Sequence, residues 1–390
     1  MTTPQLSAKQ QARLQSAFSS LQTGRDQEAR ASFEELIAEI GLDATGWLAY
    51  AHCCFRLEDP DAAINALDRS LDLEPNNLRA LLLKADCLEE SGESRQAMEY
   101  YQACLGLTSG ISELPPDVEQ GLARARQAVE RKNREYRRFL DEKMRQDSID
   151  AEFRRSRFSQ SLDLMLGEKE IYYQEPRRYY YPGLPQIQFY EAEDFDWSAP
   201  LMAATDVIRE ELLAVMNDPG NFAPYLQGDS NHLGQYDPGL LNNRDWGALY
   251  LWEHGHLLPQ SQQRFPATLE ALAQVPMPVI PAQAPMALFS RLAPRTRIPP
   301  HNGVLNTRLI CHLPLIVPEN CGALRVGNEQ RPWKEGELLI FDDSIQHEAW
   351  NDSDEERVVL LFEVWRPELD DEERRLVSWL LAAVKEYYGE

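Results

Sequence analysis

Apolar residues recur along the first hundred residues with a period of 34. Two sets of alanines have this spacing, and each alanine of the second set is followed four residues later by a large apolar residue. The first set is Ala17, Ala51 and Ala85; the second is Ala29, Ala63 and Ala97, followed by Phe33, Leu67 and Tyr101. Small residues let helices approach closely, and a bulky residue one turn later fills the gap between helix pairs. The pattern predicts six helices between residues 10 and 108.

A 34-residue period of paired helices is that of tetratricopeptide repeats. Trp47 and Pro75 also fall where this repeat carries an aromatic residue and a terminating proline. Three repeats are about the minimum that buries a continuous core, so residues 1–112 are predicted to form an all-α solenoid. Two roles stay open for it: support for the rest of the chain, or recruitment of a polypeptide on its concave face.

Residues 113–174 have few apolar positions. Their central part, GLARARQAVERKNREYRRFLDEKMRQDSIDAEFRRSRF, interleaves acidic and basic residues. This pattern is typical of a long solvated helix that links two domains, although its basic bias leaves open a role in attracting acidic ligands.

From residue 175 the pattern changes to short apolar runs separated by turn residues. A helix is expected from Met202 to Met216, with Ile208, Leu212 and Val215 on one stripe. The expected strands are ALYLWEHG, MALFSRLAP, TRLICHLPL, GALRVG, GELLIFDD and RVVLLFEVW. Many short strands predict a double-stranded β-helix (jelly-roll) barrel over residues 175–370, which makes the chain an α + β multidomain protein.

The last segment, residues 371–390, has the period of an amphipathic helix. Its predicted apolar face consists of Leu376, Trp379, Leu380, Ala383, Val384 and Tyr387. We expect this face to pack against the barrel or against a partner subunit.

Composition narrows the possible partners and compartment. The chain has 390 residues, with 39 basic and 63 acidic side chains and a net charge of −24, so nucleic acid is not expected to bind. We find neither a secretory signal nor an apolar run of bilayer-spanning length, and six cysteines occur without a CxxC pair. These features predict a cytoplasmic protein without a membrane partner, in which Cys53, Cys54, Cys87 and Cys104 are small core residues.

The candidate chemistry lies in His301-Asn302-Gly303, His347 and Arg357. Two histidines separated by predicted strands, with an arginine on the following strand, suit a barrel that holds one iron and anchors a dicarboxylate. The usual iron site has a carboxylate two residues after the first histidine, where this chain has Gly303. Asp342 and Asp343 are alternative ligands, although two aspartates at a strand end are more typical of a turn.

The segment from His301 to Pro367 includes PHNGVLNTRLICHLPL and GELLIFDDSIQHEAWNDSDEERVVLLFEVWRPEL. It resembles the aspartyl/asparaginyl β-hydroxylase family of 2-oxoglutarate-dependent oxygenases, which itself carries glycine in place of the carboxylate ligand. The resemblance implies that His301 and His347 bind Fe(II) and that water takes the position of the missing ligand. It also implies an oxidoreductase that uses 2-oxoglutarate and O2 as cosubstrates.

The resemblance assigns the cosubstrate contacts as well. Arg357 and Ser290 match the residues that hold the distal carboxylate of 2-oxoglutarate, and His312 matches the contact to the carboxylate near the metal. Trp252 matches an aromatic residue that lines the pocket, although aromatic residues in such strands are usually part of the core. The family usually has an arginine where this chain has Ile310, and Arg308, on the same face of the strand, is the candidate to compensate.

The implied reaction is hydroxylation of a β-carbon, with 2-oxoglutarate converted to succinate and CO2. Asp or Asn in a peptide or protein is the expected substrate, and a lipid acyl chain or a small molecule is an alternative. A different class also stays open: a non-catalytic tetratricopeptide adaptor whose barrel is a cupin-like binding module. His254 and His256 form an H-x-H pair, but their loop-like context favours exposed side chains over a metal site.

Overall fold

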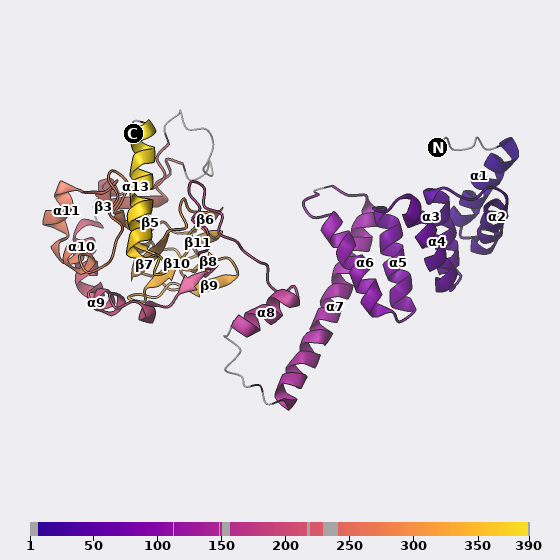
Figure 1. Ribbon diagram of the computed structural model, residues 1–390, viewed down its shortest axis with the longest axis horizontal. Coiled ribbons are helices and arrows are strands. Elements are labelled where there is room, and N and C mark those ends of the chain that lie inside the picture. Colours follow the sequence, from indigo (N-terminus) through magenta and orange to yellow (C-terminus); the bar gives the residue numbers. More distant parts are fainter. Residues whose placement is uncertain are drawn as a thin grey trace. The chain divides into compact units, whose positions relative to one another are not determined.

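The computed structural model describes residues 7–111, 113–147, 149, 157–216, 219–228 and 241–388. The chain forms two compact units, Met1–Gly167 and Glu168–Glu390 (Figure 1). Our predicted boundaries at residues 112, 174 and 370 stay predictions, and part of the charged segment, residues 148 and 150–156, lies outside the described ranges.

The N-terminal unit is helical, and the predicted six helices of the repeats are confirmed. They are α1 (Ala8–Gln22), α2 (Asp26–Glu39), α3 (Ala44–Arg56), α4 (Pro60–Leu73), α5 (Leu78–Glu90) and α6 (Ser94–Leu107). All six alanines of the 34-residue pattern are fully buried, and so are Phe33 and Leu67. Cys53, Cys54, Cys87 and Cys104 are buried and free, as expected for small core residues. The period in the sequence therefore reports the packing between helices.

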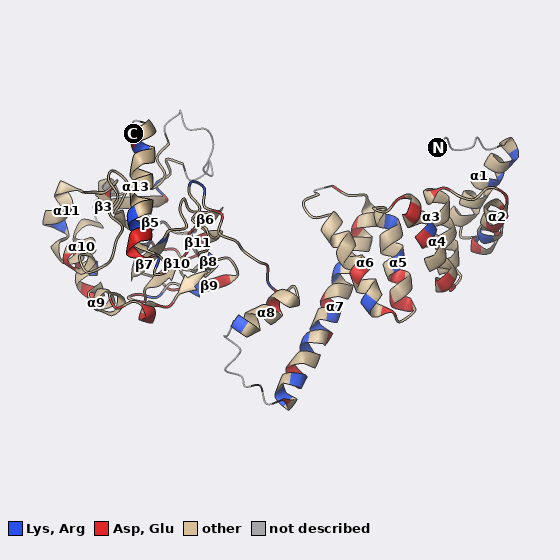
Figure 2. Cartoon of the chain, viewed as in Figure 1, with Lys and Arg blue, Asp and Glu red and all other residues tan. Residues whose placement is uncertain are grey.

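Helix α7 (Pro116–Gln146) differs from the predicted solvated linker. Its first three turns bury Val118, Leu122 and Ala125 in the same cluster as Leu82 of α5. A Cβ atom on Gly121 would lie 2.7 Å from Cδ1 of Leu82, so the side chain of Leu82 would have to shift to accept any other residue there. The later turns carry the alternating charges (Figure 2). The helix therefore caps the last repeat, and α8 (Arg157–Met165) follows it.

The C-terminal unit contains two antiparallel sheets (Figure 1). The larger has the order β1-β10-β7-β12-β5-β3-β2, with β4 paired to β3, and the smaller has the order β6-β11-β8-β9. The strands are β1 (Phe189–Tyr190), β2 (Ala223–Pro224), β3 (Trp246–Glu253), β4 (His256–Leu257), β5 (Ala287–Leu292), β6 (Thr296–His301), β7 (Arg308–Ile316), β8 (Ala323–Val326), β9 (Glu329–Pro332), β10 (Leu339–Phe341), β11 (His347–Asn351) and β12 (Arg357–Trp365). The antiparallel strands are confirmed, but hydrogen bonds do not join the two sheets into a closed barrel among the described residues.

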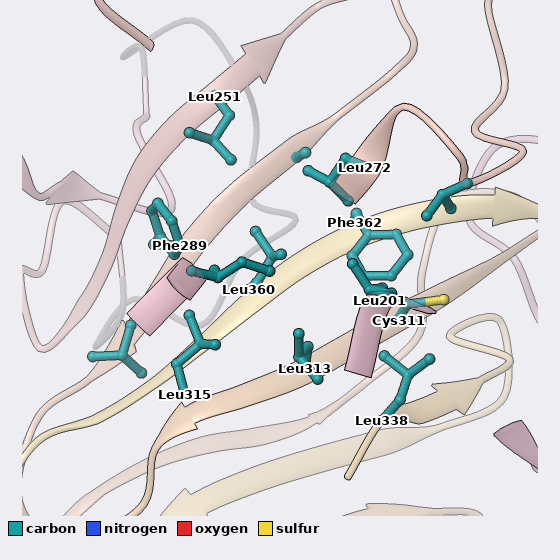
Figure 3. Close-up of a cluster of buried hydrophobic side chains, with 14 of the residues drawn as sticks. Leu201, Leu251, Leu272, Phe289, Cys311, Leu313, Leu315, Leu338, Leu360 and Phe362 are labelled. Carbon is teal, nitrogen blue, oxygen red and sulfur yellow. The ribbon is translucent and has the colours of Figure 1, made fainter. Parts of the chain in front are cut away.

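The two faces of the larger sheet carry separate cores because side chains alternate along each strand. Leu313, Leu360 and Phe289 lie on one face together with Leu201 and Leu272 of the covering helices (Figure 3). The helices and turns of this unit are η2 (Ala192–Asp194), α9 (Ser198–Ala203), α10 (Thr205–Met216), η3 (Pro219–Asn221), α11 (Pro259–Arg264) and α12 (Pro266–Leu272). The opposite face packs on apolar residues of the smaller sheet, including Ile298, Leu324 and Ala349.

The predicted C-terminal helix is α13 (Asp371–Tyr388), but most of its predicted apolar face is exposed, and packing of this face on a partner subunit stays a prediction. Trp379 is 66% exposed and Tyr387 is 83% exposed, while Val377 is buried instead. Polar contacts attach the helix: Lys385 Nζ donates to the carbonyl of Ala282 at 2.7 Å, and Gln283 Nε2 donates to that of Leu381 at 2.8 Å.

None of the helices in the described ranges combines the length and the apolar character needed to span a bilayer.

Candidate active site

A cavity of about 560 Å³ is lined by strands of both sheets of the C-terminal unit. The strands β3, β5, β7, β10 and β12 contribute from the larger sheet, and β6, β8 and β11 from the smaller. Six of the seven site residues predicted from the sequence line it: Ser290, His301, Arg308, His312, His347 and Arg357. These six residues, which are up to 67 positions apart in the sequence, thus share one cavity.

His301 and His347 are cross-strand partners on β6 and β11, and their ring centroids are 4.1 Å apart. Nδ1 of His301 lies 2.8 Å from the carbonyl oxygen of Pro299, and Nδ1 of His347 lies 3.1 Å from that of Ile345. A carbonyl only accepts, so each Nδ1 carries the proton and each Nε2 keeps a lone pair. This tautomer is the one in which imidazole binds a metal through Nε2.

The pKa values of both histidines favour the same neutral form. Burial lowers the pKa of His301. Burial and the neighbouring His301 hold the pKa of His347 well below its usual range. Neutral imidazole, not imidazolium, is the form that coordinates a metal ion.

Arg357 is a buried cation that lacks hydrogen-bond partners within the described parts of the chain. Its side chain is 1% exposed, and both Nε and Nη1 have no acceptor. Its guanidinium lies 4.6 Å from the ring centroid of Trp333, and burial lowers its pKa to about 10. A buried charge without a partner is costly, so this arrangement is suited to an anion from outside.

Ser290 lies on β5 beside β12, the strand that carries Arg357. Its Oγ accepts a hydrogen bond of 3.3 Å from Nε1 of Trp246. Because the indole N–H only donates, the hydroxyl of Ser290 keeps its own proton for a second partner. Trp246 is in turn stacked on Tyr225, with ring centroids 4.1 Å apart.

His312 lies on β7 and presents a second unpartnered group to the cavity. Its Nδ1 is buried and has no hydrogen-bond partner in the described structure. Burial, with a contribution from Arg357, holds its pKa well below the usual range. The ring is stacked on Trp333 at 5.6 Å between centroids, which fixes its orientation.

Arg308 lines the cavity but is engaged by two acids. Nη1 donates to Glu363 Oε2, and Nη2 lies 3.6 Å from Oδ2 of Asp343. Burial works to lower the pKa of Arg308, but these two carboxylates raise it overall. Ile310, two residues further along β7, is 6% exposed and supplies only apolar surface. Arg308 therefore does not present a free charge in the place of the missing arginine.

Asp343 lies beside Gly303, where the usual carboxylate ligand is missing. The backbone N–H of Gly303 donates to the carbonyl of Asp343 at 2.6 Å. A Cβ atom on Gly303 would lie 2.7 Å from Oδ1 of Asp343 and closer still to Oδ2. Burial raises the pKa of Asp343 to about 7, against the opposing effect of Arg308. The carboxylate of residue 343 thus occupies the space next to residue 303.

Asp342 has a different role from its neighbour. It is fully buried and accepts a 2.6 Å hydrogen bond from Nη1 of the equally buried Arg366. Gln174 and Ser344 also donate to it. The two aspartates do form a turn, as expected, but Asp342 fixes the turn while Asp343 faces the cavity.

The structure places Trp252 away from the cavity, contrary to the prediction. It packs against the core on the opposite face of the larger sheet, near Ala287. The aromatic residues that do line the cavity from this side are Trp246 and Tyr225. The register shift between Tyr250 and Trp252 explains the difference, because a bulge moves the following side chain to the other face.

The residues present fit a metal held by two histidines. Among the described residues, no group of three His, Cys, Asp or Glu converges in a metal-binding arrangement. His301 and His347 nevertheless present two Nε2 atoms to a cavity that also contains the buried, unpartnered Oδ1 of Asp343. Such a donor set of two neutral nitrogens and nearby oxygens suits a first-row divalent metal. His254 and His256 are exposed and line no part of this cavity.

Comparisons with known proteins agree with this site. The profile of the aspartyl/asparaginyl β-hydroxylase family matches residues 202–367, and a tetratricopeptide repeat profile matches residues 55–105. The human aspartyl/asparaginyl β-hydroxylase is 34% identical over 170 residues, which is 43% of this chain and 21% of the human protein. The ornithine lipid ester-linked acyl 2-hydroxylase of Rhizobium tropici is 32% identical over 203 residues, 52% of this chain and 68% of that protein. The chain thus spans about a fifth of the length of the human relative.

Among solved structures, the translocator chaperone SycD of Yersinia enterocolitica covers 33% of this chain and 89% of its own, with 19% identity and a TM-score of 0.30.

The family profile and the two hydroxylase relatives place the C-terminal unit among hydroxylases, and its paired histidines and buried arginine lie within the matched residues. The chain belongs to the aspartyl/asparaginyl β-hydroxylase family, and tetratricopeptide repeats precede its hydroxylase domain.

Proposed function

We propose that this chain is an Fe(II)- and 2-oxoglutarate-dependent dioxygenase that hydroxylates a carbon atom of its substrate. One observation carries the proposal: the paired Nε2 atoms of His301 and His347 share a cavity with the unpartnered guanidinium of Arg357. A metal and a dicarboxylate are the two ligands that this combination recognises. The two sheets around the cavity further support assignment to the double-stranded β-helix fold.

His301 and His347 would hold the metal. With 2-oxoglutarate and O2 bound, the iron supplies the oxidising power that converts a C–H bond of the substrate to C–OH. Asp343, beside Gly303, would accept hydrogen bonds from water in the position that a carboxylate ligand has in other iron sites. In this role the aspartate orients a water molecule and keeps negative charge near the metal without coordinating it.

Arg357 and Ser290 would bind the distal carboxylate of 2-oxoglutarate. The guanidinium has free Nε and Nη1 donors, and the hydroxyl proton of Ser290 is not used by Trp246. A charge-assisted pair of this kind orients a carboxylate as well as holding it. His312, with Nδ1 unpartnered, would donate a hydrogen bond to the carboxylate at the other end of the keto acid. Apolar walls from Ile310, Leu324 and Leu361 would limit the access of water.

The β-carbon of Asp or Asn in a peptide or protein is the first candidate substrate, on the basis of the family. Besides Arg357, the described lining of the cavity has two cations that would meet an acidic substrate group, Arg177 and Arg308. Arg308 would have to exchange Glu363 or Asp343 for that group, since both acids engage it in the structure.

An apolar substrate is the second candidate, and the pairing of Arg308 with Glu363 favours it. Glu363 already neutralises Arg308. At the position where the family usually has an arginine, this chain has the buried Ile310. Tyr225, Leu226 and Met286 add apolar surface to the same cavity. The Rhizobium tropici acyl hydroxylase matches more of this chain than the human β-hydroxylase does, which is consistent with an acyl chain or a small molecule as substrate.

The repeats would recruit a polypeptide to the enzyme. A shortened protein starting at Glu168 should keep 2-oxoglutarate turnover in the absence of substrate, yet lose efficiency on a long peptide. The reason is that a second binding site raises the effective concentration of a tethered substrate. Equal efficiency of the shortened and complete proteins on that peptide would assign the repeats a supporting role.

An anaerobic titration of the complete protein with Fe(II) and then 2-oxoglutarate tests the central proposal. We expect the weak visible charge-transfer band of a keto acid bound to Fe(II), and its loss in His301→Ala. His256→Ala is the matched control, because this histidine is exposed and outside the cavity. Absence of the band in the wild-type protein would instead support a non-catalytic adaptor in which the cavity serves only for binding.

A further inference from the structure

A second cavity of about 270 Å³ adjoins the candidate active site, and Val304 and Arg308 line both. We call it the side pocket. The side chains that line it include those of Arg178, Thr307, Arg308, Glu363 and Lys385. None of the predicted site residues except Arg308 lines it, so it is separate from the metal and cosubstrate positions.

Backbone contacts from three segments fix the walls of the side pocket. The N–H of Arg178 donates to the carbonyl of Val304 at 3.1 Å, which holds this arginine over the chain that leads into β7. On the other side, Lys385 of α13 donates to the carbonyl of Ala282 at 2.7 Å. The backbone of Arg178, whose side chain is exposed, and the ammonium group of Lys385 are therefore held by hydrogen bonds.

Thr307 presents a buried hydroxyl that has no partner. Its side chain is 1% exposed, lines the side pocket, and has no hydrogen bond to Oγ1 in the described structure. Nε of Arg308, the next residue, is also buried and unpartnered. Buried polar groups are nearly always hydrogen-bonded, so two unused donors in one pocket indicate a ligand that accepts hydrogen bonds.

The charges around the side pocket favour an anion. Arg178, Arg308 and Lys385 contribute three cations, and Glu363 is the one carboxylate among its described lining residues. Glu363 already accepts hydrogen bonds from Arg308 and from the backbone N–H of Met286. The pocket therefore has a positive excess in a chain whose net charge is −24.

We propose that the side pocket binds a small oxyanion, a carboxylate or a phosphate group, through Thr307, Arg178, Lys385 and the Nε of Arg308. An oxyanion accepts several hydrogen bonds at once and matches both the donors and the charge. The anion would use Nε of Arg308, while Nη1 of the same guanidinium holds Glu363 and the side chain also lines the active-site cavity. Binding there is thereby coupled to the substrate side of the active site.

The test measures binding of inorganic phosphate and of acetate to the complete protein, with 2-oxoglutarate at saturation to block Arg357. Broadening of the phosphate ³¹P line and saturation transfer to acetate detect weak complexes. We expect Thr307→Val to weaken binding roughly fivefold, as the loss of one hydrogen bond implies, and Arg178→Gln to weaken it further. Tighter binding of phosphate than of acetate would identify the occupant as a phosphoryl group, and the reverse order as a carboxylate.

Two controls distinguish anion binding in the side pocket from nonspecific attraction of anions to positive charge on the protein. Arg375→Gln removes an exposed arginine of α13 that pairs with Glu372, and binding should not change. Thr307→Val should not lower the unfolding temperature, because the lost hydroxyl has no partner in the protein. The proposal is wrong if neither anion binds, if Thr307→Val and Arg178→Gln bind like the wild type, or if 2-oxoglutarate abolishes binding.

Discussion

Gly303 and Asp343 occupy a space that cannot hold side chains from both residues. A Cβ atom on Gly303 would lie 2.7 Å from Oδ1 of Asp343 and closer to Oδ2. The backbone N–H of Gly303 also donates to the carbonyl of Asp343, so the two segments cannot easily separate. The glycine in the HNG motif is therefore matched by an aspartate 40 residues later.

The first prediction follows from this steric relationship. Gly303→Ala should destabilise the protein by about 1–3 kcal/mol, since overpacking a buried site forces neighbouring groups to move. Gly106→Ala is the matched control, because no atom lies within 4 Å of a Cβ there and the residue is in a helix. Chemical denaturation of both variants measures the difference, and equal unfolding free energies would contradict the predicted overlap.

An exchange of the two side chains extends this test to the metal. Gly303→Asp alone should fold poorly, but combined with Asp343→Gly it should regain stability, because the carboxylate moves from one residue to the other. The double variant should still bind a divalent metal, now with a carboxylate two residues after His301 as a direct ligand. A double variant no more stable than Gly303→Asp would mean that the two positions do not share this space.

The second prediction concerns the histidine pair. His301→Ala or His347→Ala should abolish Fe(II) binding and succinate formation, because each removes one of two Nε2 donors. The unfolding temperature of the metal-free protein should change little compared with the His256→Ala control. Wild-type turnover in either variant would show that the metal ligands are elsewhere.

The third prediction concerns Arg357. Arg357→Ala should raise the KM for 2-oxoglutarate well over tenfold, since losing one partner of a buried charged pair costs about 2–5 kcal/mol. Arg291→Ala is a suitable control, because this arginine is on β5 and pairs with Glu356 instead. Steady-state kinetics at varied 2-oxoglutarate concentrations measures this KM. An unchanged KM would mean that another cation binds the distal carboxylate of 2-oxoglutarate.

The sequence predicted which residues line the cavity better than it predicted the strands that carry them. The motif pair and the family resemblance pointed to Ser290, His301, His312, His347 and Arg357, and all five line one cavity. The strands that carry the two histidines, β6 and β11, were not among the expected ones. β6 contains two prolines, which are tolerated because it lies at the edge of its sheet.

Other parts of the site depend on contacts between distant residues. The pairing of Arg308 with Glu363 is made across β7 and β12, and a sequence does not show which charges meet there. The bulge that turns Trp252 away from the cavity likewise has no local signal. For Gly303, the missing carboxylate was visible in the sequence, but its steric neighbour Asp343 required the fold.

The fourth prediction concerns the pH dependence of stability. The pKa of Asp343 is raised to about 7, so between about pH 4 and pH 7 the folded protein holds a proton that the unfolded chain releases. This group therefore stabilises the fold at low pH and loses that effect as the pH rises through the window. The unfolding temperature of metal-free Asp343→Asn should increase relative to the wild type from pH 4 to pH 7. A constant difference would contradict the raised pKa.

The last prediction addresses metal affinity. Two neutral imidazoles leave a bound dication without a charged protein ligand, so an anionic cosubstrate beside it should strengthen binding. We expect Mn(II), used as an inert substitute for Fe(II), to bind at least about tenfold more tightly with saturating 2-oxoglutarate. Thermodynamic linkage requires Mn(II) to tighten the binding of 2-oxoglutarate by the same factor. Isothermal titration in both orders measures the two factors. In Arg357→Ala, the effect of the same 2-oxoglutarate concentration on Mn(II) affinity should be smaller. Identical Mn(II) affinities with and without 2-oxoglutarate in the wild type would indicate that Asp343 coordinates the metal directly.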